Sequence, residues 1–332
     1  MGPEADVRIM TPVHTADRIV LARLPSGIEI ETTIHRYRGG SGPTVYVQAA
    51  QHGREINGTE VLRCLHDRLL STDLAGEIVA VPVADPLTFD RVSYTTPEVI
   101  DSVNANMNRA WPGRSDGTIH ERMAATLWAE ACEADAIIDL HTGSPEMLTH
   151  VVFMYGNEES RALAEAFGTD LLLAERAGEE ANEEWDQRGF DGKLRVAATR
   201  AGIPSITPEL AHNKQIVESA VEAGVEGMVN LLRDQGVVHG EPEPTGKRRL
   251  ARNHLGRVIA TDSGLFRADP DLELGERIEA GTRLGVVYDP ASYEVLQEAV
   301  ADRDGILYAL AKEATVTGGE KLANVALPLE DD

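Results

Sequence analysis

The chain has 332 residues, 42% of them hydrophobic, and a formal net charge of −24 at pH 7. This length allows one large domain or two moderate ones, and the negative charge argues against nucleic acid and membrane surfaces as partners. No apolar run of about 18 residues predicts a transmembrane helix, and the N-terminus lacks the features of a secretory signal. Two cysteines without a disulfide framework suit a reducing compartment, so we expect a cytoplasmic protein. The oligomeric state stays open, and a homo-oligomer is possible.

Arginine dominates the basic residues. Of the 31 lysines and arginines, the lysines number five: Lys193, Lys214, Lys247, Lys312 and Lys321. A diffuse acidic surface poor in lysine is typical of salt-adapted proteins, in which concentrated salt screens the self-repulsion. We therefore predict a halophilic source, and the alternative is an acidic mesophilic protein.

The apolar pattern predicts strands that alternate with helices. Residues 1–43 are interpreted as an extended N-terminal segment with one alternating strand at 28–34. Further strands are expected at 44–50, 78–83, 136–140 and 203–207. Helices are expected after residue 55, after a capping box at 118–121, and at 215–232. Such alternation predicts an α/β domain with a largely parallel sheet flanked by helices. Ligands of these sheets gather at the carboxyl ends of the strands.

A linker rich in Pro, Gly and Glu at residues 240–247 ends this pattern. Short strands punctuated by glycine follow, and residues 274–285 look like part of a small β-sandwich of the lipoyl or biotinyl kind. We therefore expect a catalytic domain over residues 1–240 and an all-β domain over residues 241–332.

Metal-ligand residues follow two of the predicted strands. His52 and Glu55 are three residues apart just after the first buried strand, and His141 ends the strand at 136–140. Two histidines and a carboxylate, with water at the open position, are the ligands of a hydrolytic zinc site. Taken singly, an HxxE pair more often marks a solvated helix turn, and a lone His is more often structural.

Two further polar segments strengthen the case for an enzyme. Asn108 and Arg109 form an adjacent pair suited to recognising a carboxylate, although such an arginine also pairs with surface acids. Glu209 ends the strand at 203–207 and has the chemistry of a general base beside a metal. Without the other segments it would be one of 55 acidic residues.

Together, these four segments resemble the succinylglutamate desuccinylase/aspartoacylase family of zinc-carboxypeptidase-like enzymes. The family motifs HGxE, DLNRxFPG, DLHTG and TxELG match, in this order, residues 52–55, 106–113, 139–143 and 207–211. Departures from the motifs include Asn106 for Asp, Trp111 for Phe and Ala211 for Gly, and Pro208 precedes the Glu. None of these departures removes a proposed metal ligand or the proposed base. They affect the expected shape of the substrate pockets, so the motifs do not identify the substrate.

The resemblance implies an amidohydrolase that cleaves an N-acyl amino acid such as an N-acetyl or N-succinyl amino acid. It assigns one Zn²⁺ to His52, Glu55 and His141, general base and acid catalysis to Glu209, and substrate binding to Asn108 and Arg109. Arg91 is the candidate for stabilising the oxyanion. The C-terminal domain is expected to narrow the mouth of the site, where Tyr293 is a candidate contact.

The ligand pattern also fits other proteins. One alternative is a metallocarboxypeptidase that acts on short peptides, and another is a non-catalytic metal- or ligand-binding member. Asp139 is either an acceptor for a metal-bound histidine or a turn cap. His120, His150 and His212 are expected to be structural or exposed rather than ligands.

The charge pattern predicts a dependence on salt, because unscreened carboxylates repel one another in dilute buffer. The chain should lose structure there and regain it in molar KCl, which far-UV circular dichroism across a KCl series measures. A fully folded protein with no response to KCl would contradict the halophilic interpretation.

Overall fold

The computed structural model describes residues 12–143, 146–176, 185–186, 188–243, 246, 248–312 and 315–329. A thirteen-stranded mixed sheet runs through the molecule. Its strands lie in the order β1 (Val13–Arg23), β2 (Glu29–Arg38), β4 (Glu77–Val81), β3 (Thr44–Ala49), β5 (Ala136–Gly143), β9 (Ser205–His212), β7 (His150–Met154), β8 (Leu171–Glu175), β10 (Arg249–Ile259), β17 (Lys321–Pro328), β15 (Gly305–Leu310) and β12 (Arg277–Ile278), and β6 (Glu146–Met147) pairs with β15.

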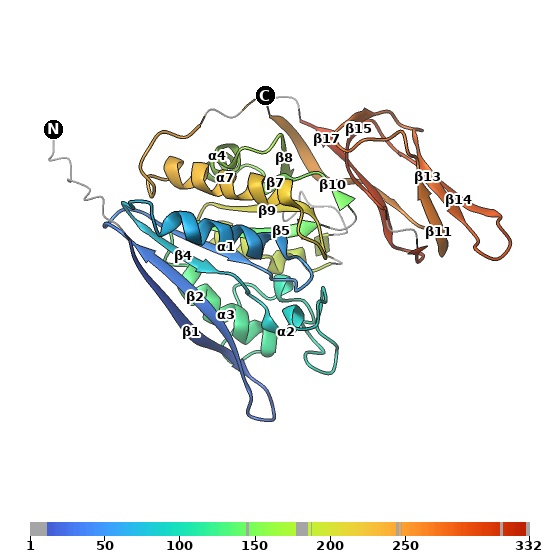
Figure 1. Cartoon of the computed structure of the whole chain (residues 1–332). Coiled ribbons are helices and arrows are strands. Elements are labelled where there is room, and N and C mark those ends of the chain that lie inside the picture. Colours follow the sequence, from blue (N-terminus) through green and yellow to red (C-terminus); the bar gives the residue numbers. More distant parts are fainter. Residues whose placement is uncertain are drawn as a thin grey trace.

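Helices cover both faces of this sheet (Figure 1). On one face lie α1 (Asn57–Leu69), α4 (Glu158–Phe167) and α7 (Glu218–Asp234), whose apolar stripes share a core with β3 and β5. On the other lie α3 (Ile119–Ala131), which packs against β1, and α6 (Leu194–Arg200), which packs against β5, β7 and β9. The shorter elements are α2 (Pro86–Phe89), η1 (Met107–Arg109) and η3 (Phe190–Gly192).

The strands that carry the predicted site are parallel neighbours. β4, β3, β5 and β9 pair in parallel, with Gln48 beside Asp139 and His141 beside Glu209. Every residue of β5 is buried, as expected for a parallel strand that is covered on both faces. Their carboxyl ends therefore meet at one edge of the sheet, as expected for an α/β fold.

A second, four-stranded antiparallel sheet lies in the C-terminal part, in the order β14 (Val295–Val300), β13 (Arg283–Tyr288), β11 (Gly264–Ala268) and β16 (Thr315–Val316). Its apolar residues share a core with β10, β15 and β17, which gives a small β-sandwich. In Figure 1 this sandwich extends to one side of the helix-covered sheet. An α/β sheet with a small all-β unit is the fold predicted from the sequence.

The predicted strands and helices are confirmed, with three differences. The N-terminal segment forms the regular strand β1, which pairs with β2 along almost its whole length. The region between β5 and β9 contains β7, α4, β8 and α6, which the apolar pattern did not predict. The linker at 240–247 falls between α7 and β10, yet β10 pairs in parallel with β8, so one sheet crosses the expected domain boundary. Within the described residues, no helix is long and apolar enough to cross a bilayer.

Candidate functional site

Three buried side chains meet at the carboxyl end of the parallel strands. His52 and Glu55 lie in the loop between β3 and α1, and His141 lies in β5. One oxygen of Glu55 is 2.9 Å from Nδ1 of His52, and the other is 2.9 Å from Nδ1 of His141. One ligand atom from each residue lies within 4.8 Å of the other two. Imidazole nitrogens and a carboxylate oxygen form a donor set that fits a divalent metal such as zinc.

The loop that carries the first two residues has no room for a side chain at Gly53. A Cβ at Gly53 would lie 2.0 Å from the carbonyl carbon of Thr88, so only glycine fits there. Thr88 belongs to α2, which Asp85 caps by accepting bonds from Leu87 N and Thr88 N. The close approach of this loop to α2 explains the glycine of the HGxE motif.

Both histidines are oriented from behind by an oxygen acceptor. Nε2 of His141 lies 2.9 Å from Oδ2 of Asp139, and Nε2 of His52 lies 3.1 Å from Oδ1 of Asn106. Carboxylate and amide oxygens only accept, so each Nε2–H donates to them, and Nδ1 of each ring faces Glu55. This contact agrees with the interpretation of Asp139 as an acceptor for a histidine. Asn106 provides the same kind of acceptor as the Asp of the family motif.

A chain of amide groups holds Asp139 in turn. Gln48 and Gln51 each donate to one of its oxygens at 3.0 Å. Gln51 Oε1 accepts from the indole of Trp111 at 2.5 Å, and Gln48 Oε1 accepts from Tyr46 at 2.9 Å. Phe, the usual family residue at position 111, has no such donor. The replacement therefore adds a polar contact to the network behind His141.

The charges at this point favour a cation. Burial would raise the pKa of Glu55, but His52 and His141 outweigh it and lower the pKa, which keeps the carboxylate ionised. Burial would lower the pKa of His141, but Asp139 and Glu55 outweigh it and raise the pKa. The carboxylates of Glu55 and Asp139 therefore stabilise positive charge between the imidazoles, which also favours the binding of a divalent ion.

The trio opens into a cavity of about 920 Å³. Glu209 of β9 lines it and keeps part of its side chain accessible. Burial raises the pKa of Glu209 to about 7, against the opposing effect of His141. Two residues further on, Ala211 has a φ of 57°, a left-handed conformation that costs a non-glycine residue about 1–2 kcal/mol. This conformation explains the glycine that the family motif has there.

The cavity is cationic although the chain is strongly acidic. Its lining contains five glutamates and eight basic side chains: Arg54, Arg109, Arg188, Arg195, Arg257, Lys193, Lys312 and Lys321. A surplus of positive charge inside a protein of net charge −24 indicates a ligand that carries negative charge.

Asn108 and Arg109 lie in η1 and line this cavity. Oδ1 of Asn108 is buried and has no hydrogen-bond partner among the described residues. The guanidinium of Arg109 donates to the carbonyl oxygens of Arg188 and Asn108, and it lies 4.7 Å from the ring centroid of Phe190. The pair predicted from the sequence is therefore brought to the same cavity as the trio.

Arg91 and Tyr293 are not brought to it. The side chain of Arg91 donates back to the carbonyl oxygen of Leu87 at 2.9 Å, and the residue is exposed outside the cavity lining. The turn after α2 directs it away from the cavity. Tyr293 is 82% exposed in the turn between β13 and β14, also outside the lining.

Arg54 and Tyr94 are two cavity residues to which the sequence alone gave no role. The ring of Tyr94 stacks on that of His52, with centroids 3.9 Å apart, and the guanidinium carbon of Arg54 lies 5.0 Å from the Tyr94 centroid. Nε of Arg54 is buried without a partner in the described structure. Arg54 sits inside the HGxE motif, which was the available signal, whereas Tyr94 follows no motif.

A second group that the sequence analysis missed is an ion-pair cluster around Glu175, the last residue of β8. One carboxylate oxygen of Glu175 accepts from Lys193 at 2.6 Å, and the other pairs with Arg195. Burial lowers the pKa of Lys193 to about 8. Arg195 also donates to Thr207 of β9. The cluster joins β8, α6 and β9 into one wall of the cavity.

Another wall comes from the C-terminal strands. Lys321 of β17 and Arg257 of β10 line the cavity near Glu209. Burial lowers the pKa of Lys321 to about 7, and the charge of Arg257 adds to this effect. His150 and His212 also line the cavity, whereas His120 is buried between Asp85 and Asp101.

Comparison with known proteins identifies a family in which this chain has relatives. The model of the succinylglutamate desuccinylase/aspartoacylase catalytic domain matches residues 41–234, more than half of the chain. An N-alpha-acetyl-L-2,4-diaminobutyric acid deacetylase of Halomonas elongata is 28% identical over 306 residues, which are 88% of this chain and 84% of the relative.

Solved structures give the same fold. A succinylglutamate desuccinylase of a Silicibacter species has a TM-score of 0.81 at 20% identity, covering 99% of this chain and 98% of its own. A succinylglutamate desuccinylase/aspartoacylase of Rhodobacter sphaeroides has a TM-score of 0.79 at 25% identity, covering 100% and 99%. A product-bound ectoine utilization protein of Ruegeria pomeroyi has a TM-score of 0.79 at 21% identity, covering 98% of each chain.

The ordered motifs, the His-Glu-His cluster and the match over the catalytic domain lead to one conclusion: the chain belongs to the succinylglutamate desuccinylase/aspartoacylase family, whose members are amide hydrolases of the deacylase type.

Proposed function

We propose that this protein is a zinc-dependent hydrolase that cleaves the amide bond of an N-acyl amino acid. The observation that carries the proposal is the convergence of His52, Glu55, His141 and Glu209 on one cationic cavity. The substrate class agrees with the positive surplus of that cavity, because an N-acyl amino acid carries a free carboxylate. The relative from Halomonas makes N-acetyl-diaminobutyrate one substrate to test.

One Zn²⁺ per chain would be held by Nδ1 of His52, the carboxylate of Glu55 and Nδ1 of His141. When bound, it would polarise the amide carbonyl and lower the pKa of water from about 15.7 toward about 7. The residues behind the ligands hold them in the required orientation, since Asp139 and Asn106 fix the proton of each imidazole on Nε2.

Glu209 is the proposed general base and acid. It lies in register with His141 on the neighbouring strand and keeps an accessible carboxyl group in the cavity. It would take a proton from the attacking water and then deliver it to the nitrogen of the departing amine, so that the amide becomes a free carboxylic acid and a free amine.

The substrate carboxylate would be bound by Arg109 with Asn108. Both line the cavity, and the unpaired Oδ1 of Asn108 provides an acceptor for the substrate's N–H. For the oxyanion of the tetrahedral intermediate we propose Arg54 in place of Arg91. Arg54 adjoins Glu55 in the chain, lines the cavity and keeps a buried donor unpaired, whereas Arg91 is exposed elsewhere.

The proposal is tested by measuring amine release from a panel that contains N-acetyl and N-succinyl amino acids, N-acetyl-diaminobutyrate and a dipeptide, in molar KCl with Zn²⁺. We expect turnover of an N-acyl amino acid that a chelator abolishes and zinc restores. Turnover of the dipeptide alone would point to a carboxypeptidase instead. Silence of a folded, zinc-loaded protein across the panel would contradict the proposal.

The matched control in that assay is Glu209→Gln, which keeps the shape of the side chain and removes the base. Loss of a general base costs on the order of 10²–10⁴ in rate. We therefore expect turnover to fall by that amount while the zinc content is unchanged. Near wild-type turnover would remove Glu209 from this role.

Asp139→Asn tests the orientation of His141. The amide presents a donor as well as an acceptor to Nε2, so the metal affinity should fall by about 10–100-fold. Trp111→Phe removes only the indole donor to Gln51, so its effect should be smaller and in the same direction. Both affinities are measured by competition with a chromophoric zinc chelator. An unchanged affinity in Asp139→Asn would show that the contact does not support the metal site.

Arg54→Ala and Arg91→Ala form a matched pair for the oxyanion assignment. Removal of one oxyanion donor typically lowers kcat by about 10²–10³-fold. We expect a loss of this size for Arg54→Ala and kcat near the wild-type value for Arg91→Ala. The reverse order in steady-state kinetics would restore Arg91 to the role and exclude Arg54.

A further inference from the structure

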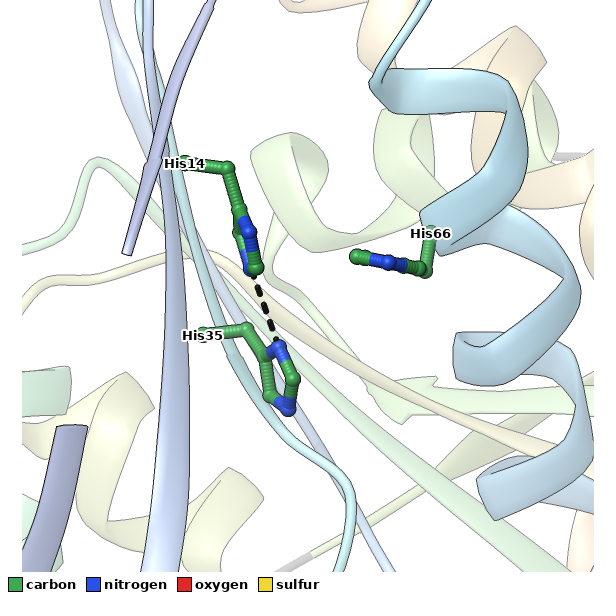
Figure 2. A group of neighbouring side chains, drawn as sticks. All are labelled: His14, His35 and His66. Carbon is green, nitrogen blue, oxygen red and sulfur yellow. Dashed lines mark hydrogen bonds between the residues drawn. The ribbon is translucent and has the colours of Figure 1, made fainter. Parts of the chain in front are cut away.

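Three histidines from distant parts of the chain meet outside the catalytic cavity. His14 lies in β1, His35 in β2 and His66 in the last turn of α1, and none of them lines the cavity. Figure 2 shows the rings of His14 and His35 in contact and the ring of His66 extending toward them from α1. All three are half-buried, which leaves one side of the cluster open to water.

The sheet register explains how the first two come together. His14 pairs with Tyr37 and Ala16 with His35 across the antiparallel β1–β2 ladder, so His14 and His35 are diagonal neighbours on one face. α1 packs over β3 and β5 on the neighbouring part of the sheet, and its last turn brings His66 to the same face. The ring centroids of His14 and His66 are 4.9 Å apart.

The spacing of the nitrogens is near that of a metal site. Nε2 of His14 lies 3.1 Å from Nδ1 of His35, and one nitrogen of each of the three rings lies within 4.8 Å of the other two. Zn–N bonds of about 2.0–2.1 Å in tetrahedral geometry hold ligand nitrogens about 3.3–3.4 Å apart. A rotation of the His66 side chain is therefore enough to bring its nitrogen to this distance from the nitrogens of His14 and His35.

The three rings are packed closely together. The ring centroid of His35 lies 5.3 Å from that of His14 and 5.8 Å from that of His66. The hydroxyl of Tyr37 lies 2.7 Å from Nδ1 of His66 and so holds that ring in place beside the other two.

The position of His66 also favours a cation. It lies at the C-terminal end of α1, where the helix carries partial negative charge. Three imidazoles with an open fourth position are a donor set for borderline divalent ions.

We propose that His14, His35 and His66 form a second metal site, for Zn²⁺ or a similar borderline divalent ion, that fastens the β1–β2 hairpin to α1. The site is independent of the catalytic trio, so its existence does not rest on the function proposed above. Its ion cross-links a sheet edge to a helix and stabilises the folded state by binding it alone.

The test is a zinc count on tag-free protein that has been stripped with a chelator and titrated with ZnCl₂ against a chromophoric competitor. We expect two equivalents in the wild type, one in the double variant His14→Gln/His35→Gln, and two in His239→Gln, which removes an exposed histidine elsewhere. The double variant should keep wild-type turnover, and zinc should raise its thermal midpoint less than that of the wild type.

An equal number of zinc equivalents in the wild type and in the folded double variant would overturn the proposal. If the double variant fails to fold by circular dichroism, His66→Gln makes the same comparison, because it leaves only two imidazoles. Failure of the catalytic proposal gives a different result. The wild type is then inactive, but the variants still bind one zinc equivalent fewer than the wild type.

Discussion

The carboxylate of Glu55, placed between two imidazoles, is the contact on which the site depends. A buried carboxylate is costly unless charge and hydrogen bonds compensate it, and here His52, His141 and the amide of Thr142 all face its oxygens. Each imidazole must present Nδ1 toward Glu55, which requires an acceptor behind it at Nε2. Asp139 and Asn106 provide these acceptors, so the outer residues are as necessary to the arrangement as the ligands.

The fold provides this arrangement through strand register. Parallel pairing sets Gln48 beside Asp139 and His141 beside Glu209, which brings the proposed base next to a proposed metal ligand without a loop between them. The loop after β3 then needs Gly53, because the backbone of α2 occupies the space of a side chain. The C-terminal strands extend the same sheet and contribute Lys321 and Arg257 to the cavity. The C-terminal strands therefore form one wall of the cavity.

Much of this was predictable because the residues follow apolar strands in a recognisable order. The trio and Glu209 lie at or just after strand ends, and the Asn108–Arg109 pair lies in a loop that matches a family motif, so local pattern and chemistry agree there. Spacing alone does not reveal that the side chain of Arg91 bonds back to the carbonyl oxygen of Leu87 outside the cavity lining. Tyr94, the Glu175 cluster and the His14–His35–His66 group depend on contacts between distant segments. The sheet that crosses residue 240 was hidden for the same reason, since the linker composition does not reveal that β10 pairs with β8.

The proposed role of His52, Glu55 and His141 is to hold a catalytic metal together. Anomalous diffraction at the zinc edge, from crystals of the chain grown with Zn²⁺, locates the ion. We expect a peak bonded to Nδ1 of His52, the Glu55 carboxylate and Nδ1 of His141, on the side of the cavity that Glu209 lines. Zinc-loaded crystals without a peak between these three residues would rule out this arrangement.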